Sequence, residues 1–240
     1  MGRALFGMAA ALALAACQAP VRPASPATNP GGAPAGAPSA RSILPPPVSG
    51  SVDALAAAID ADARQSDHES DSKRRADLAD DAARNADACL AEAPQAAACL
   101  YYHGVALGLA ARAHPARAVE SLKSMLESLT RAEAVDPEYD EAGPARVRAL
   151  VLTRAPGWPL GPGDADAGVA AARRAVTLRP QYPPNVLALA EALSKHGDAD
   201  EARVNYLRAR DLAQALPAGT DRDDWLHDVD RALHKENGSP

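Results

Sequence analysis

Apolar and polar residues repeat with the 3.6-residue period of amphipathic α-helices over most of the chain after residue 51. The clearest case is residues 116–135, where Val119, Leu122, Leu126 and Leu129 fall on one stripe. Such a stripe must be buried against neighbouring helices. The alternating β-branched and aromatic positions that strands need are almost absent. The pattern therefore predicts an all-α domain.

Proline and glycine mark the ends of the predicted helices. Stops fall at Pro94, His114-Pro115, Asp136-Pro137, residues 155–163, Pro180, Gly197 and Pro217. Side chains at Asp164, at Asp198 with Glu201, and at Thr220 with Asp223 are expected to cap helix starts by accepting free backbone N–H groups. Helices are expected at residues 52–65, 70–92, 96–112, 116–135, 142–154, 165–178, 184–196, 199–215 and 221–235.

Three similar segments, AEAPQAAACLYY, AVDPEYDEAGPA and TLRPQYPPNVLA, each place a proline between two helical stretches. Their prolines, Pro94, Pro137 and Pro180, are spaced by 43 residues, and such regular spacing predicts stacked repeat units. The last unit is the clearest, with large and small residues on both helices around Gly197. It resembles a tetratricopeptide repeat, which implies a TPR-like α-solenoid of antiparallel helix pairs.

The helical pattern stops at residues 155–164, APGWPLGPGD, which hold three prolines, three glycines and one of the two tryptophans. No regular element survives there, because proline fixes φ and lacks a donor while glycine permits positive φ. We expect an insertion in one repeat, anchored by the packing of Trp158. The alternative is that Trp158 lines a recess that recognises a partner.

Residues 1–16 combine Arg3 with an apolar stretch over residues 4–14 that is too short to span a bilayer. The following Leu14-Ala15-Ala16-Cys17 resembles a bacterial lipobox. This resemblance implies a lipoprotein signal peptide, lipidation of Cys17, and a place on the periplasmic face of the outer membrane of a Gram-negative bacterium. An ordinary secretory signal with an incidental cysteine is the alternative.

Residues 17–50 are rich in proline, alanine and glycine, and no apolar period there could build a core. We expect a disordered tether that reaches about 30 Å as a coil. The helical domain is expected over residues 51–240.

The net charge of −6 becomes more negative once Arg3 is removed. This charge argues against nucleic acid and against an anionic lipid surface as partners. We therefore expect membrane contact only through the N-terminal lipid.

Cys89 and Cys99 lie five residues either side of Pro94, so they would face one another in a helical hairpin. In an oxidising compartment a disulfide between them would contribute about 3 kcal/mol. Two buried free thiols are the alternative.

No motif in the chain points to catalysis or to a cofactor. The spacings of the histidines and cysteines fail the patterns of zinc sites, and a phosphate loop, a dinucleotide fingerprint and a nucleophile elbow are all missing. We expect no metal site and a structural or solvated role for the histidines, which are His68, His103, His114, His196, His227 and His234.

Residues 129–193 resemble the tetratricopeptide-type lipoproteins associated with TRAP transporters, the periplasmic T component. The features that carry the resemblance are Asp136-Pro137, Gly143-Pro144 followed by Arg146, Pro156-Gly157, Gly163-Asp164, and a helix start from Asn185 to Glu191. The resemblance implies a role without catalysis, either docking a periplasmic solute-binding protein or handling a hydrophobic ligand in a channel formed by the helices.

The candidate binding residues gather by sequence around the 155–163 corner. A polar network at a concave face is expected from Arg146, Arg148, Arg154, Asp164, Asn185 and Glu191, with Trp158, Tyr139 and Tyr182 as aromatic anchors. We expect a periplasmic protein partner. The alternatives are a hydrophobic ligand or an outer-membrane assembly or secretion complex, and the sequence leaves open whether the chain forms a homo-oligomer.

Overall fold

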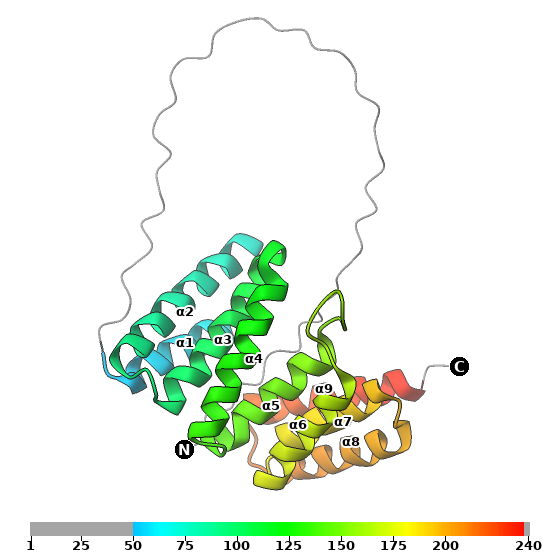
Figure 1. Cartoon of the computed structure of the whole chain (residues 1–240). Helices are drawn as coiled ribbons and strands as arrows, with labels where there is room; N and C mark the ends of the chain where they lie inside the picture. The colour runs from blue at the N-terminus through cyan, green and yellow to red at the C-terminus, as the bar shows by residue number, and fades with distance from the viewer. Residues whose placement is uncertain (1–49, 238–240) are drawn as a thin grey trace, which may run out of the picture.

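The computed structural model describes residues 50–237 (Figure 1). The predicted lipidation site Cys17 and nearly all of the predicted tether lie outside the described residues. Within residues 50–237 the secondary structure is helical and no strand forms. The helices are α1 Val52–His68, α2 Ser72–Glu92, α3 Ala97–Ala113, η1 Pro115–Arg117, α4 Ala118–Val135, α5 Tyr139–Arg154, α6 Ala165–Leu178, α7 Pro183–His196, α8 Ala199–Gln214 and α9 Thr220–Asn237.

The prediction of an all-α domain is confirmed, and each predicted helix has a counterpart. Two of its details are wrong. Val119, placed on the buried stripe, has 41 % of its surface exposed, because α4 turns Leu122, Met125 and Leu129 toward the core instead. Asp198 does not cap α8 with its side chain, because its carboxylate contacts His196. The cap at Asp164 forms as expected, accepting from the backbone N–H of Ala167.

The helices pack in chain order, each against the next one. In addition, α1 packs on α3, α3 on α5, α5 on α7, and α7 on α9, so these five helices form one row, called here the odd row. The even-numbered helices lie between them along the chain. In Figure 1, α1 to α4 and α5 to α9 form two groups of helices that meet where α4 is followed by α5.

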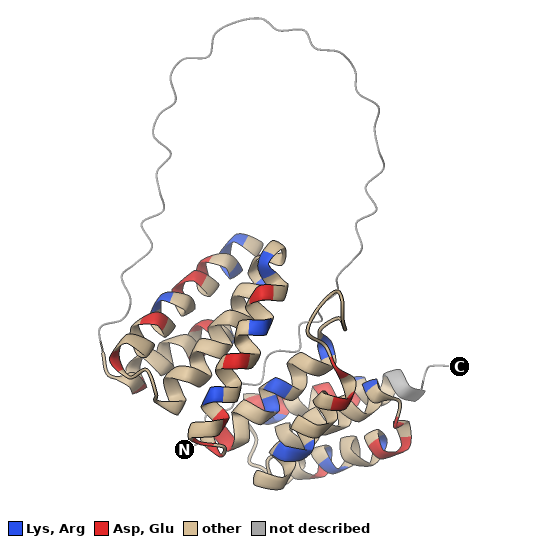
Figure 2. Cartoon of the chain, viewed as in Figure 1, with Lys and Arg blue, Asp and Glu red and all other residues tan. Residues whose placement is uncertain are grey.

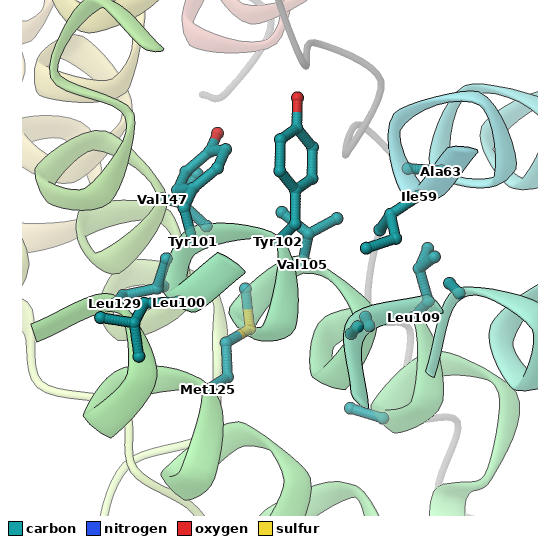
Figure 3. Close-up of a cluster of buried hydrophobic side chains, with 14 of the residues drawn as sticks. Ile59, Ala63, Leu100, Tyr101, Tyr102, Val105, Leu109, Met125, Leu129 and Val147 are labelled. Atoms are coloured by element: carbon teal, nitrogen blue, oxygen red, sulfur yellow. The ribbon is translucent and has the colours of Figure 1, made fainter. Parts of the chain in front are cut away.

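The two largest buried clusters occupy most of the helix interfaces. The first joins α1 to α5 and includes Ile59, Leu100, Met125 and Val147 (Figure 3). The second joins α5 to α9 through other side chains, among them Ala149, Val186, Leu193, Tyr206 and Val229. Helix α5 contributes to both clusters and thereby couples the two groups of helices. Many of the buried side chains are alanine, which lets the helix axes approach closely.

The last helix is fixed by its tryptophan. Trp225 is 5 % exposed and packs beside Ala213, and its ring meets the ring of Tyr182 edge-on at 5.8 Å between centroids. Among the described helices none is long and apolar enough to cross a membrane.

Cys89 and Cys99 form a disulfide, with an S–S distance of 2.03 Å and 5.3 Å between their Cα atoms. The bond links the last turn of α2 to the first turn of α3, and both residues are fully buried. It therefore closes the short turn around Pro94.

We expect the double variant Cys89→Ala/Cys99→Ala to lose about 2–3 kcal/mol of unfolding free energy, because the unfolded chain is freed from the closed loop. Urea unfolding followed by circular dichroism measures the loss. A reductant should lower the urea midpoint of the parent chain and leave that of the variant unchanged. Equal midpoints for the reduced and oxidised parent would contradict the stabilising role.

Candidate functional site

The backbone at the start of α5 makes a left-handed turn without glycine. Asp140, Glu141 and Ala142 have φ values of 48°, 55° and 64°. This conformation brings Cβ too close to the carbonyl oxygen and costs about 1–2 kcal/mol per residue. Such a turn persists only where the surrounding structure holds it in place.

Arg146 stabilises this left-handed turn through hydrogen bonds. Its guanidinium is completely buried, and its Nη1 donates to the backbone carbonyl oxygens of Asp140 and Glu141, each at 3.1 Å. Its Nη2 donates to the carboxylate of Asp140 at 2.8 Å. One side chain therefore satisfies both the carbonyls of the turn and the buried charge on it.

Asn185, at the start of α7, completes the network. Its Oδ1 accepts from Arg146 at 3.2 Å, while its Nδ2 lies within donating distance of the carbonyl oxygens of Glu141 and Ala175 at 3.0 and 3.2 Å. Asn185 is itself fully buried. The network therefore ties the start of α5 to the end of α6 and the start of α7.

Aromatic rings cover the ion pair. The hydroxyl of Tyr101 donates to the carboxylate of Asp140 at 2.8 Å, and the ring of Tyr182 lies 5.2 Å from the guanidinium carbon of Arg146. Tyr139 packs against Tyr101 at the edge of the network, with 5.4 Å between ring centroids. Because Tyr182 also contacts Trp225, the rings connect the network to α9.

Burial dominates the titration of these groups. It raises the pKa of Asp140, although the charge of Arg146 and the hydrogen bond from Tyr101 oppose the rise. Burial and the Asp140 carboxylate raise the pKa of Tyr101 well above its ordinary value. The Asp140 carboxylate is hydrogen-bonded to both Arg146 and Tyr101. The arrangement is therefore suited to holding the backbone of the turn rather than to transferring a proton.

A second polar pair bridges the odd row. Nε and Nη2 of Arg154 donate to the two carboxylate oxygens of Glu191 at 2.6 and 2.7 Å. Arg154 ends α5 and Glu191 lies on α7, so the bidentate pair joins neighbouring helices of the row. Arg148, which was expected in the same polar network, joins neither this pair nor the buried network, because its side chain reaches Glu133 on α4 at 2.5 Å.

Trp158 does not anchor the 155–163 corner, so the expectation that it packs there is wrong. Its side chain is 90 % exposed, and Leu160 beside it is 74 % exposed. The corner is closed by backbone contacts instead: Gly163 N–H donates to the carbonyl of Pro156 at 2.8 Å. A Cβ on Gly163 would lie 2.1 Å from the carbonyl oxygen of Ala155, so only glycine allows this close approach. The peptide bond between Trp158 and Pro159 is cis.

The structure does not bring the expected network together as one site. Arg146, Tyr182 and Asn185 meet in the buried network, with Tyr139 at its edge. The Arg154–Glu191 pair, Trp158, Arg148 and the capping Asp164 each lie elsewhere. Asp140, Glu141 and Tyr101 belong to the network but were not predicted from the sequence. No glycine marks the left-handed turn, and Tyr101 is 39 residues from its partner Asp140, so neither spacing nor composition could have identified them.

A hollow of about 420 Å³ lies beside the network, at the connection from α6 to α7. It is open to solvent and carries an ion pair between Arg179 and Glu141, whose atoms lie 3.3 Å apart. The residues that line it are Glu141, Leu178, Arg179, Pro180, Gln181 and Tyr182.

One contact among the described residues joins a histidine to a serine, as in a catalytic dyad. Nδ1 of His103 lies 2.9 Å from Oγ of Ser128, but the buried serine donates its own proton to the carbonyl of Leu100 at 2.9 Å. In this arrangement His103 donates to Ser128, whose own proton is directed at the Leu100 carbonyl rather than at the imidazole. Across residues 50–237, no cluster of three or more His, Cys, Asp or Glu side chains has the arrangement of a metal site.

Asp62 on α1 is held in an unfavourable ionised state. Partial burial and the nearby Asp81 carboxylate raise its pKa to about 6, against the opposing charge of Arg84. The folded chain therefore binds this proton more tightly than the unfolded chain does. As pH rises from about 4 through 6, the folded state loses stability at this position.

The sequence matches no protein-family model, and it shows no significant similarity to a curated protein. The class of protein is therefore defined by the structure itself, as an all-α chain of packed helix pairs with a buried arginine network between them.

We expect Arg146→Met to lose about 3–5 kcal/mol of unfolding free energy, because it leaves the Asp140 carboxylate buried without its partner. The added change Asp140→Asn should restore part of the loss, since it removes that charge. Urea unfolding of the parent and the variants measures both effects. Arg173→Met, at an exposed ion pair, is the matched control and should change the free energy by less than about 0.5 kcal/mol. An Arg146→Met chain as stable as the parent would refute the role of the network.

We expect Asp62→Asn to stabilise the chain by about 1 kcal/mol at pH 7.5, a figure reduced for the screening of a half-exposed group. The gain should shrink at pH 4.5, where the folded parent carries the proton. Thermal melts at the two pH values test this. Asp230→Asn, which changes an exposed position on α9, should show no such difference, and an equal gain for Asp62→Asn at both pH values would contradict the assignment.

Proposed function

We propose that this chain is a periplasmic, lipid-anchored scaffold, a TPR-like α-solenoid that binds a protein partner on the curved face of its odd row. Stacked helix pairs of this kind present extended concave surfaces, which is how repeat proteins bind their partners. The resemblance of Leu14-Ala15-Ala16-Cys17 to a lipobox supports the anchor and the compartment, and the arrangement of the described helices supports the binding role.

The observation that carries the proposal is the curvature of the odd row. Arg64 on α1, the first helix of the row, lies 3.2 Å from the carboxylate of Asp221 on α9, the last helix. Two elements separated by three others in a row can meet only if the row bends back toward itself. The face inside this bend is called here the inner face.

Ion pairs between neighbouring helices fix the shape of the inner face. Arg112 on α3 binds Asp67 on α1 at 2.8 Å, and the Arg154–Glu191 pair joins α5 to α7. Figure 2 shows that Lys, Arg, Asp and Glu are spread over the helices without a continuous positive region. The result is a preformed, charged and polar surface, which suits a protein surface better than an apolar ligand.

The buried network adds rigidity at the middle of the row. It sets the direction of α5 relative to α6 and α7, because each of these helices supplies a group to it. A surface that is already ordered loses little conformational entropy on binding. The strained turn therefore supports a fixed docking geometry.

A TRAP-type solute-binding protein is the first partner to test. The residues that carry the resemblance to the TRAP-associated lipoproteins include Arg146 and Asn185, which hold the network together. An outer-membrane assembly or secretion complex is the alternative partner. The hollow beside the network is lined by Leu178, Pro180 and Tyr182 as well as by the Arg179–Glu141 ion pair, so a carrier of a hydrophobic ligand stays the alternative function.

The test is capture of the partner by the full chain, tagged and crosslinked in its own cell. The parent should recover one protein reproducibly, a periplasmic one. Asp221→Arg places like charges together at the closure of the inner face and should lower the recovery at least tenfold. Asp230→Arg makes the same charge change on the opposite side of α9 from Asp221 and should leave recovery unaltered.

Circular dichroism establishes that both variants are folded before recovery is compared. Recovery of no protein by the parent, or equal recovery by Asp221→Arg, would refute binding at the inner face.

A further inference from the structure

The loop over residues 155–163 projects beyond the ends of α5 and α6 (Figure 1) and carries two large apolar side chains at its tip. We propose that Trp158 and Leu160, called here the apex, are the anchor that enters an apolar pocket on the partner protein. This inference rests on the proposed function, because it assigns a second contact to the same partner.

The exposure of the apex is unusual for this chain. Trp158 is 90 % exposed, whereas the only other tryptophan, Trp225, is buried. Burying a tryptophan removes about 150–250 Å² from water, so leaving one in solvent forgoes a large stabilisation. Contiguous exposed apolar surface marks interaction sites, Trp158 and Leu160 lie two residues apart on one loop, and tryptophan is enriched among the residues that dominate binding energy.

The loop holds the apex in a defined position. The backbone N–H of Leu160 donates to the carbonyl of Gly157 at 3.0 Å, and that of Asp164 donates to Leu152 at 2.9 Å. A Cβ on Gly161 would lie 2.6 Å from the carbonyl oxygen of Pro156, so the two sides of the loop are in close contact. The indole is thus presented by a structured loop and loses little backbone entropy when it binds.

Charge distinguishes a protein pocket from a membrane surface as the occupant. Residues 155–163 contain no charged side chain, and in Figure 2 the loop is drawn in tan. Arg154 precedes the loop but is paired with Glu191. Asp164 and Asp166 follow at its base, with Asp166 in contact with His196, and the chain as a whole is acidic, with a net charge of −6. Acidic groups beside the apex repel anionic phospholipids, whereas two apolar side chains on a narrow tip match a single apolar pocket.

The apex and the inner face can be reached by one partner. The loop leaves α5 directly after Arg154, whose pair with Glu191 belongs to the inner face. A partner that covers this pair is therefore adjacent to the loop. The pocket that accepts the indole should be apolar, with one acceptor for its N–H group.

The experiment places a photo-crosslinking amino acid in the full chain at position 158, at position 221 on the inner face, or at position 204 as a control. Val204 lies on α8 and, at 64 %, is the next most exposed large apolar side chain in the described part of the chain. After irradiation in the producing cell, positions 158 and 221 should crosslink to the same protein and position 204 should not. Mapping the peptide joined to position 158 identifies the pocket.

Affinity then measures the contribution of the apex. With the captured protein in purified form, Trp158→Ala should raise Kd about 30-fold, the effect of a strong anchor residue, while Val204→Ala should change it less than about twofold. Both side chains lie outside the core, so both variants are expected to fold, which thermal melts verify.

Each other outcome has a distinct meaning. Crosslinking from position 221 but not from 158, or an unchanged Kd for Trp158→Ala, overturns the inference and leaves the proposed function intact. Crosslinking of position 158 to phospholipid or to a second copy of this chain also overturns it. Crosslinking to protein from none of the three positions refutes the proposed function and the inference together.

Discussion

The arrangement of the helices depends on the buried pairing of Arg146 with Asp140 beneath a left-handed turn. A buried charge is costly unless it is paired and hydrogen-bonded, and here the guanidinium meets a carboxylate, two carbonyl oxygens and a side-chain amide. The same contacts hold three residues at positive φ. The cost of the turn and the cost of the buried charge are therefore offset by one set of hydrogen bonds, and removing any member exposes both costs.

The position of this pairing explains its influence on the rest of the chain. Helix α5 takes part in both buried clusters through Val147 and Ala149, and Asn185 connects the turn to α6 and α7. The direction of α5 thus sets how the two groups of helices meet. The direction of α5 therefore also determines the shape of the inner face, where ion pairs join successive helices of the odd row.

The sequence predicted the helical elements well because their signals are local. Proline and glycine positions located the helix ends, Asp164 was identified as a cap, and the placement of Cys89 and Cys99 around Pro94 put them opposite one another. The left-handed turn could not be predicted, because its residues carry no preference for positive φ and are held there by partners distant in sequence. The prediction that Trp158 packs in the corner was wrong, because it rested on the size of the side chain. Close backbone contacts at the glycines close the loop instead and leave the indole in solvent. Arg148 was assigned to the network by proximity in sequence, but the helical rotation from Arg146 turns it toward α4.

Amide hydrogen exchange on the full chain, comparing the parent with Arg146→Met, tests most directly whether this pairing organises the helices. The account predicts that the start of α5 and the connection from α6 to α7 accelerate together by more than the loss of global unfolding free energy requires, while α1 and α2 accelerate by no more than that loss. Acceleration confined to the start of α5, or spread evenly over every helix, would contradict it.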